Sequence, residues 1–382
     1  MSLKTEFCGY VLLTLLLTVS GISSAFAQVG NTAYGDDALS SNVSGFDNSA
    51  FGSGALFSNE AGGGNTATGF NSLFYNAVGT DNTATGVYSL NRNTAGNENT
   101  ATGAFALLDN KAGSWNTGAG AFALYSNVSG NANSAFGRNA LQSNLTGTKN
   151  SAFGSDAMYS NTAGRFNSAI GYSALRSNTT GSYNSATGHF ALYSNATGSN
   201  NIAMGDFAGY QIVAGSNNIH IGNRGIVTDN AVIRIGTQGT QQATYLAGVR
   251  DVNVTGGVPV MVTATGQLGV VSSSRRYKED IRSMGDTSER LLKLHPVTFR
   301  YKQPDENNQK PEQYGLIAEE VAKVMPELVA YNEKGQPETI AYQTLTPLLL
   351  NELQREHKLV ESQAQRLASV EARLAELEAS RD

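Results

Sequence analysis

The sequence predicts a mainly β protein: a repetitive β-solenoid, or β-roll, built from 17-residue rungs, followed by a small α+β domain and a C-terminal coiled coil. Three observations carry this prediction. A motif recurs at a fixed step over residues 31–222, the density of charged residues rises abruptly at residue 273, and a heptad of apolar residues runs along the final segment. A length of 382 residues is compatible with several such parts.

The N-terminus has the pattern of a signal peptide. Lys4 supplies a positive charge, residues 10–19 form an apolar run, and residues 25–27 read Ala-Phe-Ala, a small-x-small cleavage site. We therefore expect a signal peptide over residues 1–27, a mature chain that begins at Gln28, and an exported protein that is secreted, periplasmic or at the cell surface. The alternative is an uncleaved anchor helix, for which the apolar run is short.

The composition argues against several classes of function. Cys8 is the only cysteine and lies in the predicted signal peptide, so the mature chain is expected to have no disulfide. The histidines His189, His220, His295 and His357 are scattered, and we expect no metal and no cofactor. A net charge of −5 without a basic face argues against nucleic acid as a partner. No membrane span is expected after the signal peptide is removed.

The repeat is the dominant feature of the chain. The motif Asn-Ser/Thr-Ala-x-Gly, or a near variant, begins at Asn31 and recurs every seventeen residues up to Asn218, twelve times in all. Its glycine is present in every copy, and a second glycine follows ten residues later in each of the eleven intervening steps. Between the two glycines runs Ala-Leu-x-Ser-Asn or a close variant. These features predict a β-roll head or shaft over residues 28–222.

Seventeen residues can accommodate two strands of four or five residues and two tight turns, and no 3.6-residue apolar period indicates a helix. Glycine is expected where φ is positive or where segments approach closely. The asparagines are expected to form hydrogen-bonded ladders from rung to rung. One Ala and one Leu per rung would fill a narrow interior. At about 4.8 Å per rung, twelve rungs make a rod of about 60 Å.

Larger apolar residues recur at three other positions of the repeat. They form three columns: Phe51, Phe136, Phe153 and Ile170; Phe105, Phe122, Phe190 and Phe207; Tyr125, Tyr159, Tyr193 and Tyr210. Aligned apolar columns on a surface favour a partner. We therefore expect a homotrimer that packs these columns around an axis. The alternative is an isolated solenoid with a decorated surface.

Beyond residue 222 the period breaks. Residues 231–236 resemble one shortened rung, and residues 245–271 alternate short apolar runs with glycine. We predict a β-rich neck over residues 223–272 that joins the repeats to the following domain.

The charge density then changes. Residues 28–272 contain 20 charged residues, whereas residues 273–382 contain 35. The second region is therefore predicted to be a separate domain, residues 273–345, followed by a coiled-coil helix, residues 346–382. Within it the expected elements are a helix at 288–294, a strand at 297–301, a helix at 317–324 and a long helix at 346–379.

The last helix carries a heptad pattern. One row consists of Leu353, Val360, Leu367 and Leu374, and a second row consists of Glu356, Gln363, Val370 and Leu377. Such a pattern predicts a coiled coil, in which polar residues of the seam can set register and oligomer number. The alternative is one amphipathic helix packed on its own domain.

Five ordered motifs occupy residues 273–345. They are Ser273-Ser-Arg-Arg-Tyr-Lys-Glu-Asp-Ile281, Pro296-Val-Thr-Phe-Arg-Tyr301, Tyr314-Gly-Leu-Ile-Ala-Glu-Glu-Val321, Pro326-Glu-Leu-Val329 and Ile340-Ala-Tyr-Gln-Thr-Leu345. In these motifs the chain resembles the endosialidase-type intramolecular chaperone family, found at the C-termini of phage tail fibres and other trimeric fibres. The resemblance implies a domain that trimerises, assists folding of the fibre and then cuts itself off.

The resemblance also implies two catalytic residues. Ser273 would be the nucleophile, Lys278 the general base, and the cleaved bond would lie between Ser272 and Ser273. A serine hydroxyl needs a base, and a lysine can serve if burial lowers its pKa. The chain departs from the family at Ser274, where Asp is frequent, and at Tyr314, where His is frequent. Apart from the resemblance, a Ser-x4-Lys pattern indicates only a helix-entry loop with a serine cap.

The repeats also resemble the head repeats of trimeric autotransporter adhesins. Together the features predict a secreted or cell-surface homotrimeric, adhesin-like fibre that binds a glycan or envelope component and releases its chaperone domain by autoproteolysis. One alternative is a structural spacer or coat fibre without a ligand. Another is a glycan-degrading, tailspike-like enzyme, which needs paired carboxylates in a groove, whereas residues 28–272 contain only 11 acidic residues.

Overall fold

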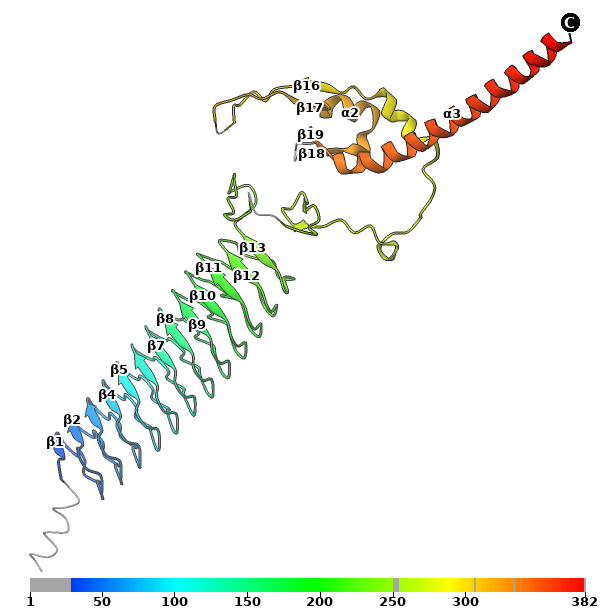
Figure 1. Ribbon diagram of the computed structural model, residues 1–382. Coiled ribbons are helices and arrows are strands. Elements are labelled where there is room, and N and C mark those ends of the chain that lie inside the picture. Colours follow the sequence, from blue (N-terminus) through cyan, green and yellow to red (C-terminus); the bar gives the residue numbers. More distant parts are fainter. Residues whose placement is uncertain (1–28, 250–253, 306, 333, 381–382) are drawn as a thin grey trace, which may run out of the picture. The chain divides into compact units, whose positions relative to one another are not determined.

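The computed structural model describes residues 29–249, 254–305, 307–332 and 334–380, and it divides into two compact units (Figure 1). The first unit contains the solenoid, extends to Gly257 and includes Val262–Gln267. The second contains Val258–Met261 and the chain from Leu268 onward. The predicted signal peptide at residues 1–27 lies outside the described residues.

The first unit is a solenoid with one parallel sheet of thirteen strands. The strands are β1 (Thr32–Tyr34), β2 (Ser49–Phe51), β3 (Thr66–Thr68), β4 (Thr83–Thr85), β5 (Thr100–Thr102), β6 (Thr117–Ala119), β7 (Ser134–Phe136), β8 (Ser151–Phe153), β9 (Ser168–Ile170), β10 (Ser185–Thr187), β11 (Ile202–Met204), β12 (Ile219–Ile221) and β13 (Ile233–Ile235). Each strand pairs with the next along the chain, and paired residues such as Ala135 and Ala152 are one repeat apart. The predicted β-solenoid with 17-residue rungs is confirmed.

Each coil is simpler than the repeat length suggested. It contains one three-residue strand, not two strands of four or five residues, and the remainder consists of turns and bends. The reason is a set of left-handed residues, such as Phe122 (φ 61°), Leu124 (φ 52°) and Ala132 (φ 56°). A second strand cannot run through them because extended backbone requires negative φ. Positive φ in the repeat is thus not limited to the glycine positions that the sequence marked.

The two repeating glycines have different causes. Gly120, in the first column, has φ 133°, and a Cβ atom there would lie 2.6 Å from the carbonyl oxygen of Gly137 in the next coil. Gly113, in the second column, has no positive φ, but a Cβ atom would lie 2.5 Å from the Asn110 side-chain oxygen. Both positions therefore exclude larger side chains, the first through φ and close approach and the second through close approach alone.

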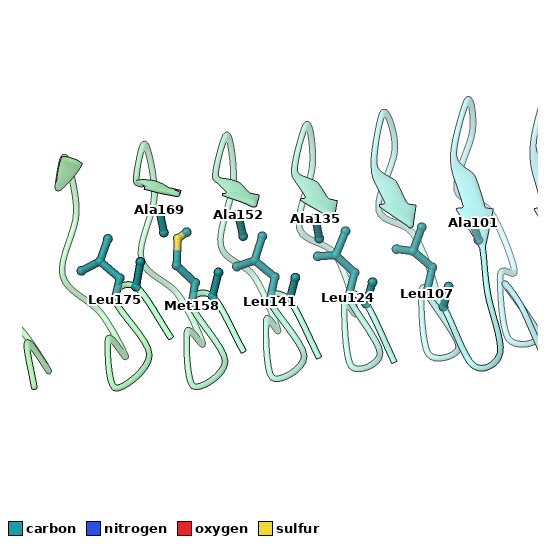
Figure 2. Close-up of a cluster of buried hydrophobic side chains, with 14 of the residues drawn as sticks. Ala101, Leu107, Leu124, Ala135, Leu141, Ala152, Met158, Ala169 and Leu175 are labelled. Atoms are coloured by element: carbon teal, nitrogen blue, oxygen red, sulfur yellow. The ribbon is translucent and has the colours of Figure 1, made fainter. Parts of the chain in front are cut away.

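The interior consists of two alanine rows and one leucine row. The strand alanines, such as Ala135 and Ala152, point towards the row that contains Leu124, Leu141 and Met158, and all five are fully buried (Figure 2). A second buried alanine precedes most members of the leucine row, and buried Ser72 and Ser89 take its place before Leu73 and Leu90. Most rungs therefore hold one more interior alanine than expected. Burial of each leucine stabilises the fold by about 2 kcal/mol, so the solenoid is stabilised coil by coil.

Two asparagine ladders complete the interior. Asn116 Nδ2 donates to the Gly130 carbonyl at 2.8 Å, and Asn116 Oδ1 accepts from the backbone N–H of Asn133 at 3.0 Å. In the second ladder Asn127 Nδ2 donates to Asn110 Oδ1 at 2.6 Å. Because buried amides are costly unless hydrogen-bonded, these ladders fix the position of each coil on the next.

The solenoid ends in a shortened coil. Ile219 of β12 pairs with Ile233 of β13, so the last step is three residues shorter than the others, as the sequence of residues 231–236 indicated. In the described part of residues 237–272 the regular structure is limited to β14 (Met261–Val262) and β15 (Leu268–Gly269), which pair with each other. The expected neck is thus poorer in strands than its apolar runs suggested.

The second unit is a small α+β domain. Its elements are the 3-10 helices η1 (Arg275–Tyr277), η2 (Gly285–Lys293) and η3 (Pro326–Leu328), the antiparallel pairs β16 (Val297–Phe299) with β17 (Gln313–Gly315) and β18 (Val329–Tyr331) with β19 (Pro337–Ile340), and the helices α2 (Ala318–Val324) and α3 (Tyr342–Ala379). Val321, Met325, Leu328, Ile340 and Leu348 form its buried core. The four elements expected from the sequence are present, although the first is a 3-10 helix.

Helix α3 has two parts. It begins at Tyr342, four residues before the predicted start, and continues through Pro347. Its N-terminal part packs on the domain through Leu348 and Glu352, which are buried. From Glu356 onward every described residue of the helix is exposed. The alternative of a helix packed on its own domain therefore holds only as far as Arg355.

Candidate functional site

The predicted cleavage segment surrounds the single turn η1. Ser274 is the N-cap of this turn, and its hydroxyl accepts from the backbone N–H and the Nε of Arg276 at 3.4 and 3.2 Å. The hydroxyl of Ser272 accepts from the backbone N–H of Ser274 at 3.4 Å. Within the described residues, the hydroxyl of Ser273 makes no hydrogen bond. Of the three consecutive serines, the predicted nucleophile is the one whose side chain has no capping contact.

In the sequence, Ser273 precedes η1 and Lys278 follows it. Lys278 is the C-cap, and its backbone N–H donates to the Arg275 carbonyl at 3.2 Å. Both side chains are exposed, and among the described contacts no hydrogen bond joins them. The single chain therefore holds the two predicted residues five positions apart in sequence without an assembled dyad, and their catalytic roles stay predictions.

The two departures from the family pattern have simple structural settings. Ser274 replaces a frequent Asp, and a serine serves equally well as an N-cap. Tyr314 lies on β17 and is 80% exposed. Its side chain is thus available for contacts outside the single chain.

A polar cluster that the sequence did not indicate joins η2 to α3. The Ser288 hydroxyl donates to Glu352 Oε2 at 2.6 Å and accepts from Asn351 Nδ2 at 2.6 Å. Arg355 Nη1 donates to the same Glu352 oxygen at 2.9 Å. Ser288 and Glu352 are buried. No local signal could have revealed this cluster, because its two halves are 64 residues apart.

A second buried polar cluster closes the C-terminal end of the solenoid. His220 occupies the position of a rung alanine, and its Nε2 lies 3.0 Å from Asp229 Oδ2. Arg234 binds both Asp229 oxygens, at 2.7 and 2.6 Å, and the Ile226 N–H donates to the same carboxylate. Burial raises the pKa of Asp229, but hydrogen bonds from Arg234 and His220 outweigh it and hold the pKa well below its ordinary value. The scattered histidine of the sequence is thus part of a structural cap.

The three apolar columns differ in their exposure. Phe136 and Phe153 stack on the outer face of the sheet with ring centroids 4.8 Å apart and remain about two-fifths exposed. The other two columns are half-buried and pack on themselves, as in Phe190 with Phe207 at 5.2 Å and Tyr193 with Tyr210 at 5.4 Å. Of the three columns, the strand column is therefore the most exposed to solvent, although its phenylalanines stack on each other.

Two findings concern metals and membranes. In residues 29–249 and the later described ranges, no group of three His, Cys, Asp or Glu side chains is arranged to hold a metal ion. No described helix is both long and apolar enough to cross a membrane.

Comparison with known proteins identifies the C-terminal segment. Residues 273–330 match the family described as chaperone of endosialidase. The match begins at the predicted nucleophile and covers four of the five motifs. No curated protein and no solved structure gives a significant match to the chain. A chaperone-of-endosialidase segment behind a repetitive β-solenoid fits a tail-fibre-like protein.

Proposed function

Because residues 273–330 match the chaperone of endosialidase, we propose that this protein is an exported homotrimeric fibre that assembles through its C-terminal domain and then releases it. The solenoid is the shaft or head that meets a surface glycan or envelope component. The C-terminal domain is cut off by the chain itself, between Ser272 and Ser273.

The observation that carries the proposal is the exposed apolar seam of α3. Leu353, Val360, Leu367 and Leu374 are each more than half exposed. An isolated helix with such a row gains nothing from its apolar side chains, whereas a coiled coil buries them as knobs in holes. The seam lies C-terminal to the family-matched segment, which ends at residue 330, and this order supports trimerisation as its purpose.

The outer face of the solenoid sheet supports the same assembly. The first and third residues of every strand from β1 to β13 point away from the interior, and none of them is charged. They are hydroxyl residues and apolar residues, among them Phe153, Ile170 and Met204, which are 41%, 47% and 54% exposed. Depletion of charge is typical of the buried core of an interface. Three such faces can pack around one axis.

The proposed cleavage is an acyl shift followed by hydrolysis. Lys278, as the neutral amine, takes the proton of the Ser273 hydroxyl, and Ser273 Oγ attacks the carbonyl carbon of Ser272. The C–N bond breaks, an ester forms, and the proton passes to the amino group of Ser273. Water then hydrolyses the ester, leaving a carboxylate on Ser272 and the free Ser273 hydroxyl. Because the side chains are exposed in the single chain, assembly would have to bring them together.

The test compares the exported wild type with Ser273→Ala and Lys278→Ala. Mass spectrometry should find a new N-terminus at Ser273 in the wild type and intact chains in both variants. Ser274→Ala is the matched control and should still cleave. A wild-type product at residue 273 that persists in both variants would refute the dyad.

Sedimentation of the intact Ser273→Ala protein tests the assembly. A mass of three chains is expected, and a monomer would overturn the proposed fibre. A glycan array probed with this trimer would then separate an adhesin from a spacer, since a spacer binds nothing.

A further inference from the structure

The polar cluster of Ser288, Asn351, Glu352 and Arg355 lies at the boundary between the two parts of α3. Glu352 is the last buried residue of the helix, and the exposed seam begins at the next residue, Leu353. The cluster therefore stands where the domain-packed helix becomes the free coiled-coil helix.

The hydrogen bonds of the cluster are complete and directional. The one proton of the Ser288 hydroxyl goes to Glu352, while the oxygen accepts from Asn351 Nδ2, whose second proton goes to the Gly285 carbonyl at 2.9 Å. Arg355 neutralises Glu352 and also binds Asp286 at 3.2 Å and Glu289. All the partners of these α3 residues that lie outside α3 belong to η2.

Such a network is sensitive to geometry. A buried carboxylate is stable only while its charged and hydroxyl partners are in place, and a partly formed network is worse than none. Residues 351, 352 and 355 reach these partners together only if α3 is helical through Arg355. A long helix with an unpartnered seam frays readily, whereas a coiled coil holds the same turns rigidly.

The other half of the network is close in sequence to the cleavage site. Helix η2 begins seven residues after Lys278, and Ser288 is its one buried residue. Fixing η2 on α3 therefore anchors the chain seven residues beyond Lys278 and limits where the Ser273–Lys278 segment can lie.

We propose that this cluster couples assembly of the α3 coiled coil to self-cleavage, with Ser288 and Glu352 as positioning residues for the Ser273–Lys278 segment. The inference rests on the proposed function. It adds that chains in which the cluster is disrupted still form trimers but cleave themselves slowly.

The test refolds the full-length protein from denaturant and follows trimer formation by sedimentation and cleavage by gel over time. Glu352→Gln should form trimers as the wild type does, because the seam is intact, but should cleave about tenfold more slowly, as expected for loss of one charge-assisted hydrogen bond. Glu371→Gln, the same change at an exposed position of α3, should have no effect. Ser288→Ala keeps the Glu352–Arg355 pair and should slow cleavage in the same way.

A second readout separates positioning from simple loss of structure. In the uncleaved Ser273→Ala trimer, adding Glu352→Gln should speed hydrogen exchange of the η2 amides while leaving the sedimentation unchanged. Variants that cleave at the wild-type rate, or that lose cleavage only in proportion to lost trimer, would overturn the coupling alone. A wild-type trimer that never cleaves would overturn the release step and the coupling together. If Glu352→Gln does not fold, Ser288→Ala decides.

Discussion

Gly118 and Gly120 are two residues apart in the same coil, yet a methyl group meets different surroundings at the two positions. Gly118 occupies the interior position that is alanine in the neighbouring coils, and its nearest neighbours to an added Cβ are the Ala123 carbonyl at 3.3 Å and Leu107 at 3.5 Å. Gly120 has φ 133°, and an added Cβ would lie 2.6 Å from the Gly137 oxygen. One glycine is thus required by the backbone and the other is not.

We predict that Gly120→Ala destabilises the solenoid by about 2–3 kcal/mol through backbone strain and the clash. Gly118→Ala should change stability by less than about 1 kcal/mol in either direction, because it restricts the unfolded chain and fills the alanine row with little displacement. Urea unfolding followed by circular dichroism measures both. Equal losses for the two variants would contradict the strain explanation.

The lowered pKa of Asp229 predicts that its contribution to stability depends on pH. Its pKa is lowered in the folded protein, because the hydrogen bonds from Arg234 and His220 outweigh burial. A carboxylate with a lowered folded pKa stabilises the fold above its unfolded pKa of about 4, and this contribution is lost as the pH falls further. The wild type should therefore exceed Asp229→Asn in stability most at pH 7, and the difference should shrink below about pH 4.

Hydrogen exchange in β11–β13, measured at pH 7 and pH 3, would follow this difference in the coils beside the cap. Asp81→Asn is the control, since Asp81 is an exposed turn residue with φ 57° that asparagine adopts readily. A wild-type advantage that is the same at both pH values would contradict the role of the Asp229 charge.

At the scale of elements, the asparagine ladders hold the coils in register. Each interior amide bonds to its own coil and to both neighbours, so removing one leaves several buried groups unpaired. Asn116→Ala removes the bond to the Gly130 carbonyl and the acceptor of the Asn133 N–H. We predict a loss of about 2–4 kcal/mol from unsatisfied groups and the cavity.

Asn200→Ala is the matched control for the ladder. Asn200 is exposed and has no described side-chain hydrogen bond, and alanine already occupies the equivalent position at Ala132 with φ 56°. Thermal unfolding should show a loss of less than about 1 kcal/mol for this variant. A ladder variant as stable as the control would show that the amides are replaceable.

The elements differ in how far the sequence could predict them. The repeat predicts the coil length, the asparagine ladders and one alanine and one leucine per rung, because each depends only on spacing. It did not predict the single short strand. Leu124 and Phe122 have left-handed backbone, and their residue types do not indicate this conformation. The polar clusters could not be predicted either. Ser288 meets Glu352, and His220 meets Asp229, only after the chain has folded, and no periodic pattern marks these residues.

At the scale of the whole molecule, two features support the proposed assembly with other chains: the seam of α3 and the uncharged outer face of the solenoid sheet. Neither is covered within the described residues. The α3 seam alone could hold three chains together while their solenoids stay apart. In the proposed trimer, packing through the sheet face would make one shaft, and its absence would leave three rods joined only by α3.

Two phenylalanines of nearly equal exposure distinguish these arrangements. Phe153 lies on the outer sheet face and is 41% exposed, whereas Phe166 lies on a turn, stacks on Tyr183 at 5.0 Å and is 40% exposed. In the uncleaved Ser273→Ala protein, Phe153→Lys should bring a charge into the interface and weaken the trimer. The concentration at which the trimer dissociates should rise at least about tenfold, as expected for loss of some 1–2 kcal/mol of apolar burial per chain. Phe166→Lys should leave it unchanged. If sedimentation finds the two variants alike, the solenoids do not pack through their sheet faces, and α3 alone carries the assembly.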